Sequence, residues 1–147
     1  MSAASYSHGT YDTPLLGDTI GAHFEATAAR FAERPALVSR RQDARMTYAE
    51  LDAAIDAVAS SLLRMGVRAG DRVGIWAPNC AEWVLVQYAT AKVGAILVNV
   101  NPAYRTHELE YVLRQSGVRL LFSASAFKSS DYAAMIAEVA PGLDALA

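Results

Sequence analysis

The spacing of apolar residues along this chain changes between the period of a helix and that of a strand. After Thr47, apolar side chains recur at steps of three or four residues, which predicts an amphipathic helix. Thr47 and Glu50 have the spacing of a capping box, and Gly66 follows the last apolar position, so this helix has both a start and a stop signal. Its apolar positions are Leu51, Ile55, Val58, Leu62 and Met65.

A shorter helix and a β-hairpin are predicted before this segment. Asp18 or Thr19 can cap the helix, and Pro35 ends it. Two apolar runs then flank a short polar turn, which is the pattern of a β-hairpin. The predicted bounds are 18–34 for the helix, 36–41 and 45–48 for the strands, and 42–44 for the turn.

Strand and helix patterns alternate through the rest of the chain. Short unbroken apolar runs predict strands, and a helical pattern follows each of them. Asn79 caps the first of these helices, with Glu82 three positions on, and Thr106 caps the second. Gly94 and Gly117 end the two helices. The predicted strands are 72–77, 96–100 and 118–124, and the last helix covers about 130–140.

Helical connections between successive strands require the strands to be parallel. Unbroken apolar strands are typical of a sheet that is covered on both faces. The helix at 80–93 is apolar nearly all round, so it should be buried on more than one side. We therefore expect an α/β fold, an open and mostly parallel layered sheet with helices on both faces. The predicted parts are a flexible tail (1–17), the first helix, hairpin and helix (18–70), and an incomplete parallel βα subdomain (71–147).

Charge and cysteine content exclude several classes of partner. The chain of 147 residues has 13 basic and 15 acidic residues, a net charge of -2, and no basic patch that suits a nucleic acid. Cys80 is the single cysteine, and the three histidines lack the spacing of metal ligands. The first residues lack the features of a signal peptide, and no apolar run reaches the roughly 20 residues of a membrane span. We expect a cytoplasmic protein without a transmembrane segment.

The apolar content is high for a chain of this size, at 53% of the residues, although alanine accounts for part of it. Surplus apolar surface is usually covered by another segment or another molecule. The composition therefore predicts that the chain on its own self-associates through exposed apolar surface.

Two asparagines and a proline end the second predicted strand. Asn99 and Asn101 are two residues apart and so point to one face, and Pro102 stops the strand. Because ligands of open parallel sheets bind beyond the carboxyl ends of the strands, the amides can form a crevice wall. Alternatively, they bind backbone groups where the strand turns into a loop, which spacing alone favours. Trp76 and Trp83 are interpreted as core residues.

The glycine pattern argues against two common nucleotide sites. The nine glycines are widely spaced and form neither a G-x-G-x-x-G motif nor a G-x-x-x-x-G-K-[ST] motif. No Ser-His-Asp or Cys-His order suggests a nucleophile with its base. These absences disfavour a nicotinamide-dependent oxidoreductase and leave no catalytic residue to name.

Taken together, the motifs resemble the amino-terminal region of the acyl-adenylate-forming (AMP-binding) enzymes, and the resemblance begins near Thr13. It rests on the order of "TYAELDAAIDAVASSLLRMG", "GDRVGIWAPN" and "NVNPAYRTHELEYVL". The last of these is most similar to the fatty acyl-CoA synthetase branch. The resemblance implies part of a larger amino-terminal domain of a two-step ligase. ATP and a medium- or long-chain fatty acid would form an acyl-adenylate, with magnesium assisting, and coenzyme A would then take the acyl group.

The same resemblance implies that the chain lacks parts of the enzyme. The sequence ends at Ala147, before the family's lysine-containing phosphate loop and its carboxyl-terminal domain. We therefore expect these residues alone to bind no ATP, magnesium or coenzyme A, to hold no metal, and to be non-catalytic. An alternative is a stand-alone, non-catalytic α/β binding or regulatory module that pairs with a separate partner chain.

Few site residues can be carried over from the family. The loop after the third strand lies near the coenzyme A phosphates in relatives, and its cation here is Lys128. A solvated loop lysine is the simpler interpretation of that residue. The resemblance also places Asn99, Asn101 and Tyr104 at the wall of the active cleft.

Overall fold

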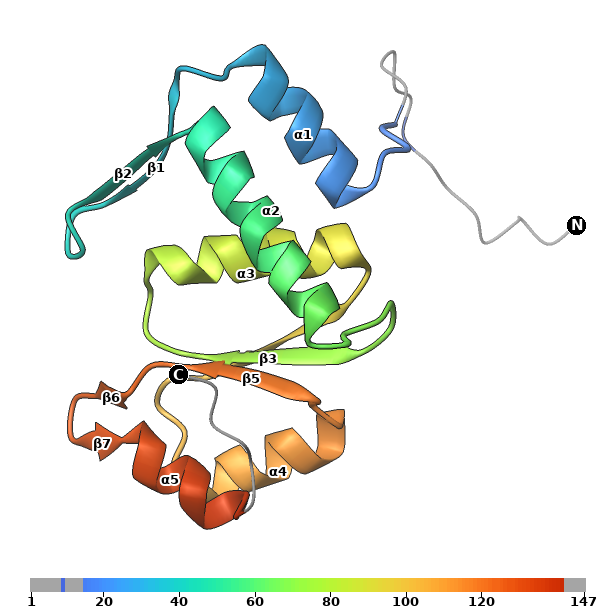
Figure 1. Ribbon diagram of the computed structural model, residues 1–147. Coiled ribbons are helices and arrows are strands. Elements are labelled where there is room, and N and C mark those ends of the chain that lie inside the picture. The colour runs from blue at the N-terminus through green and yellow to red at the C-terminus, as the bar shows by residue number, and fades with distance from the viewer. Residues whose placement is uncertain (1–8, 10–14, 142–147) are drawn as a thin grey trace, which may run out of the picture.

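The computed structural model describes Gly9 and residues 15–141, which form an α/β fold (Figure 1). The predicted tail, 1–17, lies outside these residues except for Gly9 and 15–17. The helices are α1 (Ile20–Arg30), α2 (Tyr48–Arg64), α3 (Ala81–Val93), α4 (Thr106–Ser116) and α5 (Tyr132–Val139). The strands are β1 (Pro35–Ser39), β2 (Ala44–Thr47), β3 (Arg72–Trp76), β4 (Ile96–Val100), β5 (Leu120–Ser123), β6 (Ala126–Phe127) and β7 (Ser130–Asp131).

The central sheet is parallel and has helices on both faces, as the sequence predicts. Its strand order is β4-β3-β5, and both neighbours pair with β3 in parallel register. Helices α1, α2 and α3 lie on one face, and α4 and α5 lie on the other (Figure 1). Strands β1 and β2 form the expected antiparallel hairpin. In the part of the chain that the structure describes, every helix is too short or too polar to span a bilayer.

Each face of the sheet has its own apolar core. The core beneath α1, α2 and α3 is the larger one and includes Ile55, Leu62 and Val73, which are almost fully buried. The second core joins β3 and β4 to α4 and α5. Its buried members are Trp76, Val100, Leu109, Tyr132 and Met135.

The start of α2 follows its sequence signal. The Glu50 carboxylate accepts a hydrogen bond from the Thr47 backbone N–H at 2.8 Å, and the Thr47 hydroxyl accepts one from the Glu50 N–H at 3.3 Å. These two bonds complete the predicted capping box. The bond from the Thr47 backbone N–H is the main reason that the pKa of Glu50 lies below its ordinary value.

The predicted cap of α3 is wrong. Cys80, not Asn79, occupies the N-cap position, and its side chain makes no capping hydrogen bond. The turn between β1 and β2 supplies the cap instead. The Gln42 side-chain oxygen accepts from the Ala81 N–H at 2.8 Å, and the Gln42 amide donates to the Glu82 carboxylate at 2.8 Å.

The starts of α4 and α5 also differ from the prediction. Arg105, not Thr106, is the N-cap of α4, and its N–H donates to the Glu108 carboxylate at 3.0 Å. Helix α5 begins at Tyr132 rather than near Ser130, because the short hairpin of β6 and β7 precedes it. Strands of two residues are too short for hydrophobic periodicity to reveal.

Other ends also differ from the predicted bounds, and β1, β2 and β3 are each displaced or shortened by one or two residues. Helix α1 ends at Arg30, four residues before the predicted Arg34, and Pro35 begins β1. Strand β5 is shorter than the predicted 118–124. Gly94 and Gly117 do end α3 and α4, with φ of 73° and 61°, which glycine adopts without steric cost.

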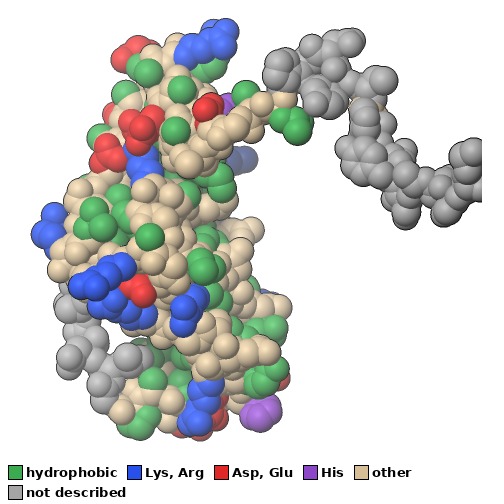
Figure 2. Space-filling view, turned by 90° about the vertical axis from the view of Figure 1, so that its right-hand side faces the viewer, with side chains coloured by type: hydrophobic (Ala, Val, Ile, Leu, Met, Phe, Trp, Pro, Cys, Tyr) green, Lys and Arg blue, Asp and Glu red, His purple; other side chains and the backbone are tan. Residues whose placement is uncertain are grey.

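Lys92 joins the three helices above the sheet. Its ammonium lies 2.9 Å from Glu25 of α1, and 2.8 and 2.6 Å from Asp52 and Asp56 of α2. Burial acts to lower the pKa of Lys92, but the hydrogen bonds to the three carboxylates raise it above its ordinary value. Figure 2 shows one face of the molecule, and acidic side chains gather in its upper part, at the height of α1, α2 and α3 in Figure 1.

Candidate functional site

The ends of the three parallel strands meet at one edge of the sheet, which we call the carboxyl edge. Trp76 ends β3 and is paired in register with Val100 of β4 and Ser123 of β5. The connection after β3 leads to α3 on one face of the sheet, and the chain after β5 leads to α5 on the other (Figure 1). Ligands of open α/β sheets bind where such connections diverge. The chain after β4 likewise leads to α4 on that second face, so the topology places the candidate site at the carboxyl edge on either side of β3.

Two stacked aromatic rings lie at the carboxyl edge, where β3 ends. The Trp76 and Tyr132 rings stack with centroids 3.5 Å apart and an interplanar angle of 6°, and both side chains are fully buried. The indole N–H of Trp76 donates to the Asn101 carbonyl at 3.0 Å, and the Tyr132 hydroxyl donates to the Pro102 carbonyl. Burial raises the pKa of Tyr132. Trp76 is thus a core residue, as the sequence predicts.

Asn101 organises the loop after β4. Its side-chain oxygen accepts from the Ala103 N–H at 2.9 Å, and its carbonyl accepts from the Tyr104 N–H at 3.1 Å. Asn101 therefore binds backbone groups where the strand turns into the loop, which is the alternative to a crevice wall that the sequence offered. Asn99 is exposed on β4, and Tyr104 packs partly buried against the core that contains Trp76. A role in a cleft wall stays a prediction for all three.

Lys128 lies in the tight turn between β6 and β7. Its backbone is in the left-handed region with φ 52°, its side chain is exposed, and its ammonium lies 5.3 Å from the centre of the Phe127 ring. Arg105, from the loop after β4, reaches the same hairpin and donates to the Ser130 hydroxyl at 2.6 Å. The structure therefore brings a second cation to the hairpin of Lys128.

The sequence places Arg105 in an exposed loop after Pro102, beside Tyr104, but no local pattern indicates that it approaches the Lys128 hairpin. Only the fold reveals that it contacts a hairpin 25 residues away. A guanidinium and an ammonium near one turn can hold an anionic group such as a phosphate, since guanidinium donates two parallel hydrogen bonds and ammonium acts as a point charge.

The nearby helix N-termini are already occupied by side chains of this chain. Gln42 and Glu82 cover the start of α3, and Glu108 covers the start of α4. The pKa of Glu108 is lowered by hydrogen bonds from the Glu108 N–H and the Arg105 N–H. The Glu108 carboxylate is therefore ionised at neutral pH. A ligand phosphate would have to displace these groups, so neither terminus is a ready anion site.

The carboxyl edge carries little reactive chemistry of its own. Among residues 15–141, no group of three or more His, Cys, Asp or Glu side chains could hold a metal ion. Burial is the main cause that raises the pKa of the Cys80 thiol, which disfavours a reactive thiolate. The chemistry of Lys128 and Arg105 at this edge suits an anionic group.

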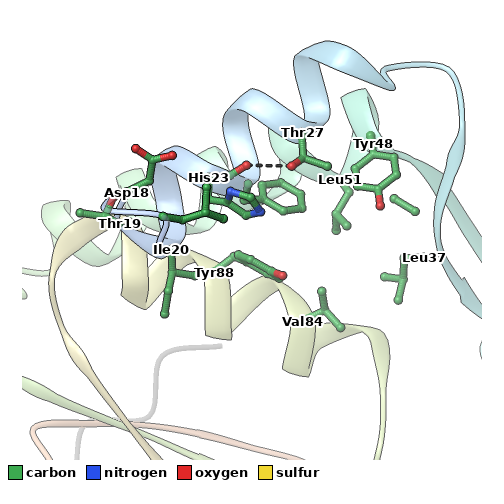
Figure 3. A pocket seen from close by; sticks show the side chains of 13 residues that line it. Asp18, Thr19, Ile20, His23, Thr27, Leu37, Tyr48, Leu51, Val84 and Tyr88 are labelled. Carbon is green, nitrogen blue, oxygen red and sulfur yellow. Dashed lines mark hydrogen bonds between the residues drawn. The ribbon is translucent and has the colours of Figure 1, made fainter. Parts of the chain in front are cut away.

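A cavity of the described structure lies elsewhere, between α1, α2, α3 and the first hairpin (Figure 3). It measures about 450 Å³ and is lined mainly by apolar side chains, with His23 and Asp18 at the α1 side. Leu16 and Ile20, which also line it, are 74% and 64% exposed. It lies on the side of α3 away from the sheet (Figure 1) and offers no strong cation for a phosphate. We therefore interpret this cavity as an apolar groove between packed elements and keep the candidate site at the carboxyl edge.

Comparison with known proteins gives one consistent family. The pattern of AMP-binding enzymes matches residues 24–146. The mouse protein named medium-chain acyl-CoA ligase ACSF2, mitochondrial, is 45% identical over 144 residues, which are 98% of this chain and 23% of that protein. A putative acyl-CoA synthetase of Bacillus subtilis, YngI, is 41% identical over 88% of this chain and 24% of its own length.

Solved structures agree with this comparison. The amino-terminal domain of FACL13 from Mycobacterium tuberculosis aligns with a TM-score of 0.76 and 28% identity, over 86% of this chain and 30% of that one. The chain thus spans about a quarter of the length of the curated relatives it matches.

Proposed function

Because the chain belongs to the family of AMP-binding enzymes, we propose that it is the amino-terminal part of an ATP-dependent fatty acyl-CoA ligase. The observation that carries the proposal is the match of 98% of the chain to a protein named an acyl-CoA ligase. The same match covers only 23% of that relative, which supports a part of a longer enzyme over a self-sufficient binding module. The mammalian relatives' names favour a medium-chain acid among the medium- and long-chain fatty acids.

The proposed reaction has two steps. The fatty acid carboxylate attacks the α-phosphorus of ATP, forms an acyl-adenylate and releases pyrophosphate. The thiol of coenzyme A then loses its proton and attacks the acyl carbonyl, so that a thioester forms and AMP leaves. The described residues contain no cluster that fits a magnesium ion, so we propose that both the magnesium and the triphosphate are held by residues beyond these.

In this enzyme, the chain supplies a scaffold and one substrate contact. We assign Lys128, with Arg105 beside the same hairpin, to the phosphate groups of coenzyme A. Asn99, Asn101 and Tyr104 are assigned to the wall of the cleft next to it. Both assignments follow what the family resemblance implies, and the position of the carboxyl edge and the chemistry of these side chains support them. We expect residues 1–147 alone to show no fatty-acid-dependent exchange of pyrophosphate into ATP.

The location of the enzyme also remains a proposal. We propose the cytoplasm, because a single cysteine suits a reducing compartment. The word mitochondrial in the relatives' names describes those proteins.

Replacement of Lys128 by Glu in the full-length ligase tests the proposed coenzyme A contact. Reversing this charge should raise the KM for coenzyme A about tenfold, the equivalent of about 1.4 kcal/mol, because an attraction to phosphate becomes a repulsion. The rate of pyrophosphate exchange, which reports adenylation, should stay unchanged. Arg45→Glu, an exposed charge reversal on β2, serves as the matched control. Collapse of pyrophosphate exchange in Lys128→Glu would show that this turn serves adenylation instead.

A further inference from the structure

The hairpin that presents Lys128 is too small to hold its own shape. Strands β6 and β7 have two residues each, and their pairing joins Ala126 to Asp131 and Phe127 to Ser130. An isolated two-stranded hairpin is marginally stable in water even when it is longer. A defined position for Lys128 therefore has to come from contacts outside the hairpin.

Tyr132 supplies several of these contacts, in addition to the packing of Phe127 against the core that contains Trp76. Tyr132 follows β7 directly, and its N–H donates to the Ser125 carbonyl at 3.0 Å, which ties the two ends of the hairpin together. Its ring stacks on Trp76 at the end of β3, and its hydroxyl donates to the Pro102 carbonyl after β4. One fully buried side chain thus links the hairpin to two strands of the sheet.

Arg105 provides a second attachment. Its guanidinium donates to the Ser130 hydroxyl at 2.6 Å, so the loop after β4 holds the hairpin from the Pro102 side as well. Ser130 lies opposite Phe127, whose ring lies 5.3 Å from the Lys128 ammonium. Both attachments reach the hairpin from the loop after β4, and both lie within four residues of Lys128.

We propose that Tyr132 is a positioning residue for coenzyme A, with the Arg105–Ser130 hydrogen bond as its partner. This inference rests on the proposed contact between Lys128 and coenzyme A. Together, the Tyr132–Pro102 and Arg105–Ser130 bonds hold the backbone of the turn, so that less of it has to be ordered when Lys128 and Arg105 bind a phosphate. Positioning matters because a flexible cation loses conformational entropy when it binds its ligand, and that loss weakens binding.

Tyr132→Phe in the full-length ligase tests the inference, since it keeps the ring stack and removes only the bond to Pro102. The KM for coenzyme A should rise about three- to tenfold, in line with the loss of one buried hydrogen bond. Pyrophosphate exchange should remain near the wild-type rate. Ser130→Ala, which removes the other attachment at a half-buried position, should raise the same KM. The matched control is Tyr111→Phe on the exposed face of α4, which should leave the KM unchanged.

Hydrogen exchange of the backbone gives a readout that does not depend on activity. In Tyr132→Phe, the amides of residues 126–131 should exchange faster, while those of β3 and α2 keep their protection. Uniformly faster exchange, or an equal loss of pyrophosphate exchange and thioester formation, would mean a general structural role and overturn the inference.

The variants separate this inference from the proposed function. If Lys128→Glu raises the KM for coenzyme A but Tyr132→Phe and Ser130→Ala do not, the positioning role is wrong and the coenzyme A contact stands. If Lys128→Glu leaves that KM unchanged, the proposed contact is wrong and the inference falls with it.

Discussion

At the scale of single residues, Gln42 shows how a side chain in one turn completes a distant helix. It accepts from the first N–H of α3 and donates to Glu82, so one amide satisfies a free backbone donor and a carboxylate together. The hydrogen bond from the Gln42 amide to the Glu82 carboxylate is the main cause that lowers the pKa of Glu82. A glutamine in a polar turn has no local pattern that predicts such a role.

Gln42→Ala should lower the free energy of unfolding by about 1 kcal/mol at neutral pH, the usual cost of a lost helix cap. Because the folded pKa of Glu82 lies below 4.5, its contribution to stability is present above pH 4.5 and is lost as the pH falls through the folded pKa. The difference between wild type and variant should therefore shrink in acid, without vanishing, since the bond to Ala81 does not titrate.

Urea unfolding at neutral and acidic pH measures this prediction. Gln87→Ala is the control, because Gln87 is an exposed amide on the same helix. It should leave the free energy of unfolding almost unchanged at both values of pH. A Gln42→Ala difference that grows in acid would contradict the proposed link to Glu82.

At the scale of the elements, Lys92 is the electrostatic contact that joins α1, α2 and α3. Its side chain is only 9% exposed, whereas Glu25 and Asp56 are 55% and 60% exposed. The lysine is desolvated while two of its partners still contact water, so removing it leaves carboxylates that can be hydrated but that repel each other. Its raised pKa means that this stabilisation is present at neutral pH and is lost only as the pH rises above about 10.

Lys92→Met should lower the free energy of unfolding by about 2 kcal/mol, less than the 3–5 kcal/mol typical of fully buried broken pairs because the carboxylates keep access to water. Denaturant unfolding of the two proteins gives the value directly. Arg114→Ala is the control, because its pair with Glu110 is 77% and 40% exposed and should contribute less than about 0.5 kcal/mol. Equal effects of the two substitutions would refute the role given to Lys92.

At the scale of the whole molecule, apolar surface remains uncovered. Leu15, Leu16 and Ile20 are 84%, 74% and 64% exposed and lie close together in the sequence, and Leu16 and Ile20 line the groove beside α1. Single exposed apolar residues are ordinary, but adjacent ones beside an apolar groove are typical of a surface that another segment covers.

The 147-residue chain should therefore form dimers or larger species as its concentration rises. Sedimentation velocity across a concentration series measures this, and Ile20→Glu should shift the chain toward monomer because a charge cannot be buried at the groove without cost. Leu63→Glu, at a position 57% exposed on α2, is the matched control. A chain that stays monomeric throughout the series would rule out self-association at this surface.

Much of the fold could be predicted because it depends on neighbours in sequence. The capping box of Thr47 and Glu50 and the glycines after α3 and α4 are local signals, and the structure confirms them. The parallel α/β arrangement also followed, since helical crossovers between apolar strands allow few other solutions. Local signals failed at the start of α3, where the cap comes from a turn 39 residues earlier.

By itself, the sequence determined the order of the elements apart from the β6–β7 hairpin, the parallel sheet and the family resemblance, because each depends on residues a few positions apart. Only the tertiary structure decided that Tyr132 bonds to Pro102, 30 residues away, and that Arg105 reaches Ser130, 25 residues away. The physical reason is that such contacts form only when the sheet brings the ends of separate strands to one edge, and strand order is not encoded in any single segment.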